Sequence, residues 1–291
     1  MYDERVLPQT GSVLGIDVGY SETRKTTAFC GLSWTRHSID WLFASARADS
    51  SSREDALIAV RSGKESEFIA VAIDGPLRPR LQVLSAYRTA ECLLSRGAFQ
   101  KRGKPGQTSS KNGRELHDHA TRLAKMVLAD YSDDIHPRPF SATAGVYEAF
   151  PNLFLGVLCD EGRYPVRPKH RRWTDCLFPL VATKLEKLIQ SLLPDRSIAK
   201  PLSSETDHEQ VAALACAITA LAAAGGECVA VGSRIDGYIV LPPLSRWGDS
   251  DKGERWAERE LRNNVRDLSS KTAVVHPPEI YAVLQLRDYG P

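Results

Sequence analysis

The chain carries the stretch Val13-Leu14-Gly15-Ile16-Asp17-Val18-Gly19 close to its start. This apolar run is too short for a helix and predicts a buried strand. A carboxylate is costly to bury unless it is paired, hydrogen-bonded or bound to a cation, so Asp17 marks either a turn or a site at the strand end. Residues 68–76 repeat the design, with an apolar run, Asp74 and then Gly-Pro. Two such strands predict a shared acidic site at one edge of a sheet.

Composition limits the class of protein. The 291 residues are 42% hydrophobic and 25% charged, as in an ordinary globular protein, and the net charge of +2 gives no overall signal for nucleic acid. Six scattered cysteines without a C-x-x-C pair favour reduced thiols over a disulfide frame or a zinc site. The start of the chain has no signal-peptide pattern, and the most apolar helical stretch, residues 211–224, is too short to span a bilayer. We therefore expect a cytoplasmic protein with no membrane partner.

The order of the elements predicts an α/β fold. Strands at 26–34 and 39–44 follow the Asp17 strand closely, which favours a three-strand antiparallel meander, and the Asp74 strand follows a short helix. Further along, the sequence predicts helices at 81–94, 113–130 and 175–193, a strand at 146–151, a helix from a capping box with Thr206 as N-cap, and strands at 228–232 and 237–242. We expect one mixed-sheet domain over residues 11–245 and an appended, charged C-terminal extension over 246–291 with one amphipathic helix.

Two more acids join the first pair. Glu148 lies on the strand at 146–151, and Asp207 lies at the start of the capped helix. Two-metal phosphoryl-transfer sites bring several carboxylates together around their cations, and Mg²⁺ and Mn²⁺ prefer such oxygen ligands. Asp17, Asp74, Glu148 and Asp207 are therefore the candidate metal-binding and catalytic residues. Each acid alone also fits a turn or a cap, and Asp207 fits an ordinary first-turn helix acid.

Basic residues gather in two segments. Residues 96–114 contain six Lys or Arg, several glycines and no acid, and residues 163–172 contain five Lys or Arg and no acid. Such clusters suit a phosphate backbone, although both could simply be solvated loops. The candidate nucleic-acid contacts are Arg88, Lys101, Arg102, Lys104, Lys111, Arg114, Lys169, Arg171 and Arg172. There is no P-loop, G-x-S-x-G or G-x-G-x-x-G motif.

Four motifs in order resemble a known family. They are G-I-D at 15–17, I-D-G-P at 73–76, Y-E-A-F-P at 147–151 and D-H-E-Q-V-A-A-L-A-C-A at 207–217. Their order and spacing resemble domain-of-unknown-function family 429, which is regarded as a family of predicted nucleases with an RNase H-like fold. Residues 88–91 (R-T-A-E) match its Arg-plus-acid element, and 237–242 resemble its closing G-W-I-x-x-P. The resemblance covers about residues 11–243.

One position departs from that family. Its helix often carries a second acid followed by Ala, where this chain has Gln210-Val211. Asp207 is then the one acidic ligand from the helix unless Glu209 or His208 contributes, which leaves a degenerate site as an alternative.

Three functions follow as hypotheses. The first is an RNase H-like, Mg²⁺- or Mn²⁺-dependent nuclease acting on DNA or RNA, with Asp17 bridging two metals. The second is a nucleic-acid-binding module with a degenerate site, favoured by Gln210. The third is a phosphotransferase of the actin and sugar-kinase type, because residues 16–21 also resemble the first phosphate hairpin of that superfamily.

Overall fold

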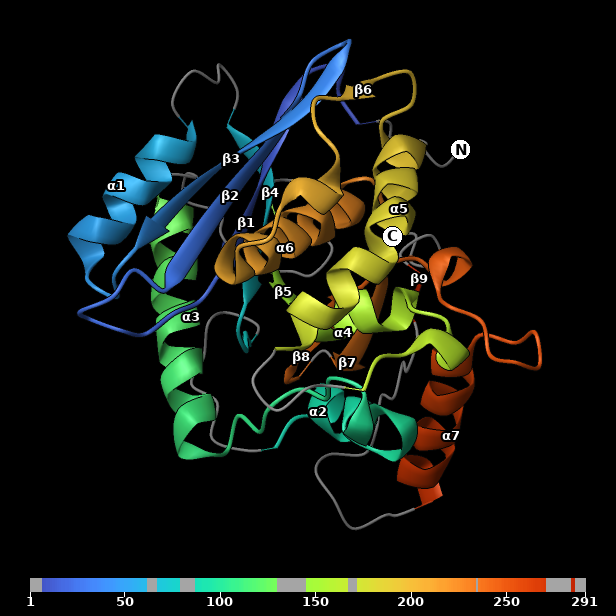
Figure 1. Ribbon diagram of the computed structural model, residues 1–291. Coiled ribbons are helices and arrows are strands. Elements are labelled where there is room, and N and C mark those ends of the chain that lie inside the picture. Colours follow the sequence, from blue (N-terminus) through green and yellow to red (C-terminus); the bar gives the residue numbers. More distant parts are fainter. Residues whose placement is uncertain are drawn as a thin grey trace, which may run out of the picture.

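The protein has one mixed sheet with helices on both faces (Figure 1). The computed structural model describes residues 7–61, 67–78, 87–129, 145–166, 172–233, 235–270 and 284–285. The strands are β1 (Gly11–Asp17), β2 (Thr27–Trp34), β3 (Ser38–Ala46), β4 (Phe68–Asp74), β5 (Gly145–Ala149), β6 (Ser197–Ile198), β7 (Val229–Ser233), β8 (Gly237–Leu241) and β9 (Leu284–Gln285). The main helices are α1 (Ser50–Arg61), α2 (Thr89–Leu94), α3 (Lys111–Ala129), α4 (Pro151–Leu158), α5 (Trp173–Leu192), α6 (His208–Ala224) and α7 (Trp256–Ser270).

The strand order is β6-β3-β2-β1-β4-β5-β8-β7-β9. β1, β2 and β3 form an antiparallel meander, whereas β4 runs parallel to β1, β5 to β4 and β8 to β5. The predicted mixed α/β sheet is confirmed. Because β1 and β4 are neighbours and parallel, their carboxyl ends meet at the same edge of the sheet.

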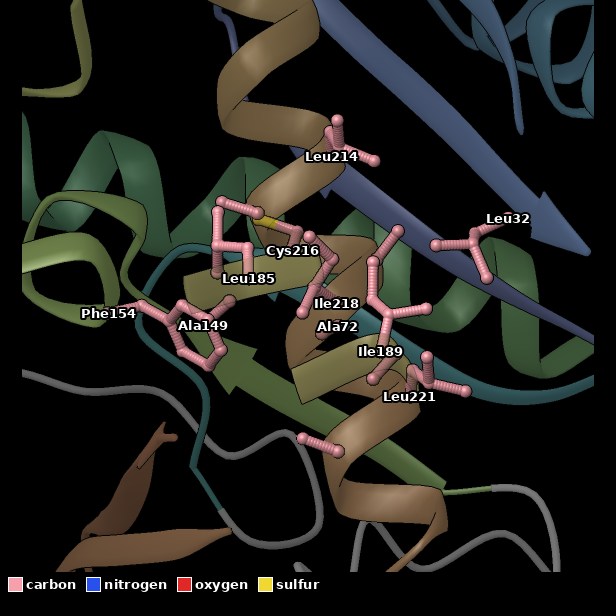
Figure 2. Close-up of a cluster of buried hydrophobic side chains, with 14 of the residues drawn as sticks. Leu32, Ala72, Ala149, Phe154, Leu185, Ile189, Leu214, Cys216, Ile218 and Leu221 are labelled. Carbon is pink, nitrogen blue, oxygen red and sulfur yellow. The ribbon is translucent and has the colours of Figure 1, made fainter. Parts of the chain in front are cut away.

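Helix α6 forms the centre of one face. Its residues Val211 to Ala223 are all buried, between the sheet and helices α4 and α5. Figure 2 shows Leu214, Ile218 and Leu221 of α6 beside Leu185 and Ile189 of α5.

Gly15 of β1 lies directly beneath this helix. A Cβ atom on Gly15 would lie 2.1 Å from both the Ala213 carbonyl oxygen and the Ala217 nitrogen. The helix backbone therefore rests on β1, and only glycine fits there.

Helices α1 and α3 cover the opposite face. Ala56, Leu57 and Val60 of α1 and Leu123 and Val127 of α3 belong to a second cluster of buried side chains. That cluster also contains the side chains of β1, β4 and β5 that point away from α6.

A third cluster contains residues beyond Arg246. Trp247, Trp256, Ala257 and Leu261 are buried with side chains of α2 and of β7 and β8. Helix α7 is the amphipathic helix predicted in the charged segment, and its apolar side packs into this cluster.

Some element boundaries differ from prediction. Of the helix predicted at 81–94, the structure describes residues 87–94, where α2 begins at Thr89. The N-cap of α6 is Asp207 and not Thr206, because the Asp207 side chain accepts a hydrogen bond from the Gln210 backbone nitrogen. None of the described helices combines the length and hydrophobicity that a bilayer span requires.

Candidate acidic site at the ends of β1 and β4

Asp17 and Asp74 occupy equivalent positions on neighbouring strands. They are partners in the parallel register of β1 and β4, so their side chains point to the same face of the sheet, the face that α6 covers. Their carboxyl groups are hydrogen-bonded to each other. Both residues are half-buried at the sheet edge. The structure therefore brings together the first two predicted acids.

Both carboxyl groups titrate abnormally. Burial, followed by the charge of Glu209, raises the pKa of Asp17 from its ordinary value of 3.8 to about 7. Burial, followed by the charges of Asp17 and Glu148, raises the pKa of Asp74 well above its ordinary value. A hydrogen bond between two carboxyl groups needs one of them protonated. A shared proton and a bound cation are therefore alternative ways to neutralise the charge of this pair.

The amino end of α6 supplies two further acids. Asp207 is exposed, and its Oδ1 accepts the capping hydrogen bond from the Gln210 nitrogen at 3.0 Å. Glu209 is half-buried and acts on Asp17 more strongly than Asp207 does. Arg172, at the start of α5, lies 4.0 Å from Glu209 (Nη1 to Oε1) and lowers the Asp17 pKa. Glu209 is therefore the helix acid with the larger influence on Asp17.

His208 is held by the neighbouring helix. Its Nδ1 lies 2.7 Å from Asp175 Oδ1 and 2.8 Å from Thr174 Oγ1, both on α5. These contacts join the first turns of α5 and α6, which places Arg172 beside Glu209.

Glu148 does not join the acid pair. In the register of β4 and β5 it is opposite Ile73, one residue before Asp74, so its side chain points to the other face. Arg88 Nη1 and Nη2 each donate to a Glu148 oxygen at 2.6 Å, and the Leu77 nitrogen donates to Oε2 at 2.9 Å. Both carboxylate oxygens are already engaged. In this structure Glu148 is the internal counter-ion of Arg88, and its role as a metal ligand stays a prediction.

Arg88, a predicted nucleic-acid contact, is a buried side chain in this structure. It is 2% exposed, and its Nε donates to Glu91 at 2.9 Å. Glu91, itself buried, accepts from the Thr108 nitrogen and hydroxyl as well. These groups together join β5, α2 and the loop before α3, and a phosphate group outside the protein cannot reach the Arg88 guanidinium.

All but one of the other basic candidates are either exposed or outside the described residues. Lys101, Lys104, Lys111, Arg114 and Arg172 are exposed. Lys169 and Arg171 lie outside the described residues.

Arg102 belongs to neither group. Its guanidinium carbon lies 4.5 Å from the centroid of the Trp256 ring, and its Nη1 lies 3.0 Å from Glu161 Oε1. Arg102 therefore connects α7, which carries Trp256, with the segment that carries Glu161.

The acid pair has no third ligand in place. Across the residues that the structure describes, no group of three or more His, Cys, Asp or Glu side chains is arranged to hold a metal ion. Asp17 and Asp74 therefore form a two-carboxylate site, with the acids of α6 next to it.

Comparison with known proteins returned no relative. The chain was compared with models of known protein families, with curated protein sequences and with solved structures, and none of them matches. Function is therefore inferred from the Asp17–Asp74 pair and its surroundings.

Proposed function

We propose that this protein is a divalent-metal-dependent nuclease with an RNase H-like fold, which hydrolyses phosphodiester bonds of DNA or RNA. The observation that carries the proposal is the in-register Asp17–Asp74 pair at the carboxyl ends of two parallel strands. The motif resemblance to domain-of-unknown-function family 429 supports the same activity, and the antiparallel meander followed by parallel strands supports the same fold.

The acid pair suits a hard cation. Mg²⁺ commonly binds proteins through one or two carboxylates and completes its shell with water and substrate phosphate oxygens. Asp17 and Asp74 supply two carboxylates in mutual contact, which is sufficient for one such ion. The second ion of a two-metal site would depend on Glu209 and Asp207 at the start of α6.

The residues have separate roles in this proposal. Asp17 and Asp74 would hold the cation, and the cation would supply the Lewis-acid chemistry that activates water and polarises a phosphate. Glu209 fills the position of the second acid that Gln210 does not supply. Arg172, exposed beside Glu209, neutralises a substrate phosphate, and the exposed basic residues of 101–114 hold the flanking strand.

Calorimetric titration with Mn²⁺ and Mg²⁺ tests the metal site. The variants are Asp17→Asn and Asp74→Asn, which keep the shape of the side chain and remove its charge. The matched control is Glu67→Gln, which also replaces a carboxylate by an amide. Glu67 is exposed and lies just before Phe68, at the end of β4 opposite Asp74. We expect the wild type and the control to bind metal and both Asp variants to lose binding.

Cleavage of labelled single- and double-stranded DNA and RNA tests the activity. The Asp17→Asn change should reduce cleavage roughly 100-fold or more, the usual scale for losing one electrostatic contribution to an active site. Undiminished cleavage by Asp17→Asn would overturn the proposal. Metal-independent nucleic-acid binding without cleavage would instead support the degenerate module, which the engagement of Glu148 by Arg88 favours.

A further inference from the structure

A buried arginine lies beside the loop that follows Asp17. Arg53 in the first turn of α1 is 4% exposed. Its Nη2 lies 2.9 Å from the Gly19 carbonyl oxygen, 3.5 Å from Thr27 Oγ1 and 3.3 Å from His119 Nδ1. Its Nε is buried and has no hydrogen-bond partner among the described residues. All of these contacts are with groups that carry no negative charge.

Burial in the first turn of α1 is energetically unfavourable for the Arg53 guanidinium. A buried charge normally has an opposite charge beside it, and the first turn of a helix disfavours positive charge. Burial, followed by the charge of Arg122, lowers the pKa of Arg53, and Asp49 opposes this more weakly. Burial, followed by the charges of Arg53 and Arg122, lowers the pKa of His119, and two acids of α3 oppose this only weakly. Within the described ranges, no carboxylate forms an ion pair with Arg53, and the nearby acids offset the positive charge only in part.

The surface of the same cluster is aromatic. Tyr20 is 46% exposed, and its ring stacks on that of His119 with 6.3 Å between centroids and 23° between planes. Arg122 is exposed, and it lies three residues after His119 on α3, so the two share a helix face. Tyr20, His119 and Arg122 therefore present an aromatic ring and a cation to solvent beside the buried Arg53.

This cluster lies close to the acid pair along the chain. Gly19, whose carbonyl accepts from Arg53, follows Asp17 by two residues, so their Cα atoms are at most about 7 Å apart. Asp17 points to the α6 face, whereas Arg53 and His119 belong to helices on the other face. A strand bound at the acid pair could therefore continue over the sheet edge to this cluster.

We propose that His119 and Arg122, backed by the buried Arg53, form a phosphate-binding subsite for single-stranded nucleic acid, with Tyr20 stacking on an adjacent base. The subsite deepens the proposed nuclease function and rests on it for the choice of ligand. A phosphate diester supplies the missing negative charge, and an exposed aromatic ring accepts any base without selecting its sequence.

Fluorescence anisotropy with a short fluorescein-labelled single-stranded DNA tests the subsite. The measurements are made on the full chain in EDTA, so that cleavage plays no part. The variants are Arg122→Gln, Tyr20→Ala and Arg53→Met, and the matched control is Lys125→Gln, an exposed residue further along α3. A thermal melt of each variant shows that it folds.

A distinct change is expected from each variant. Arg122→Gln should reduce the slope of log Kd against log salt by about 0.7, the value for one phosphate contact on a single strand. Tyr20→Ala should weaken binding roughly fivefold to a hundredfold, the scale for one stacked base. A folded Arg53→Met variant should bind more weakly than the wild type, because the charge behind the phosphate is lost. Lys125→Gln should leave the affinity and the salt slope unchanged.

Other results would overturn the subsite. Arg122→Gln and Tyr20→Ala variants that both behave like Lys125→Gln would show that the strand does not pass over this cluster. Displacement of the DNA by inorganic phosphate as readily as by unlabelled DNA, with no effect of Tyr20→Ala, would assign the cluster to free phosphate. Binding that depends on these residues without any cleavage in Mg²⁺ or Mn²⁺ would refute the nuclease and leave the subsite standing.

Discussion

Asp17 and Asp74 face each other in register across β1 and β4, and their carboxyl groups share a hydrogen bond. Without bound metal, the folded state therefore binds a proton that the unfolded chain releases. The pKa of Asp17 is about 7 in the folded protein against an ordinary 3.8. Because the folded state binds more protons in this window, the free energy of unfolding should fall as pH rises from about 4 to 7. Urea unfolding in EDTA at several pH values measures this, and the Asp17→Asn variant should give a flatter curve.

Metal binding should offset that loss. Above pH 7 Asp17 is mostly ionised. A cation that binds only the folded state stabilises it by about 2.7 kcal/mol at 100 times its Kd. We expect Mg²⁺ or Mn²⁺ to raise the melting temperature of the wild type and of Glu67→Gln. A similar rise in Asp17→Asn would place the metal elsewhere.

Glu148→Gln separates a structural role from a metal-binding role. Glu148 accepts two hydrogen bonds from the buried Arg88. Removing one partner of a buried ion pair commonly costs about 3–5 kcal/mol. We expect a large loss in the free energy of unfolding and an unchanged metal affinity in the folded protein. A lost metal affinity with unchanged stability would return Glu148 to the role predicted from the sequence.

Gly15→Ala should prevent normal folding. Its new Cβ would meet the backbone of α6 at Ala213 and Ala217, which cannot move aside as a flexible side chain could. The matched control is Gly106→Ala, where a Cβ has no neighbour within 4 Å. Soluble expression and thermal melts of the two variants measure the difference, and a Gly15→Ala variant as stable as the control would contradict the close contact.

Much of the fold could be predicted from local patterns. Asp17 and Asp74 each end an apolar run, and parallel neighbours bring such ends together, so the acid pair was predictable without the structure. The face to which the Glu148 side chain points was not predictable. A strand with apolar residues on both faces gives no sign of the face on which an acid will lie. Its register with Ile73 decides that, and the register depends on the whole sheet.

The charged side chains were harder to place for a similar reason. Arg88 lies near a basic, glycine-rich segment in the sequence, yet its partners Glu91 and Glu148 enclose it in the core. Arg53 and His119 meet across two helices that are far apart in the chain, and no local pattern predicts their contact.

The contact between Gly15 and α6 also limits which residues can occupy these positions in related sequences. A larger side chain at Gly15 would push α6 away from β1, and with it the amino end that carries Asp207 and Glu209. Any distant homologue with this geometry should therefore retain a glycine two residues before the aspartate that ends its first strand, and small residues on the facing side of the helix. That spacing is a search pattern for relatives whose overall sequence similarity has disappeared.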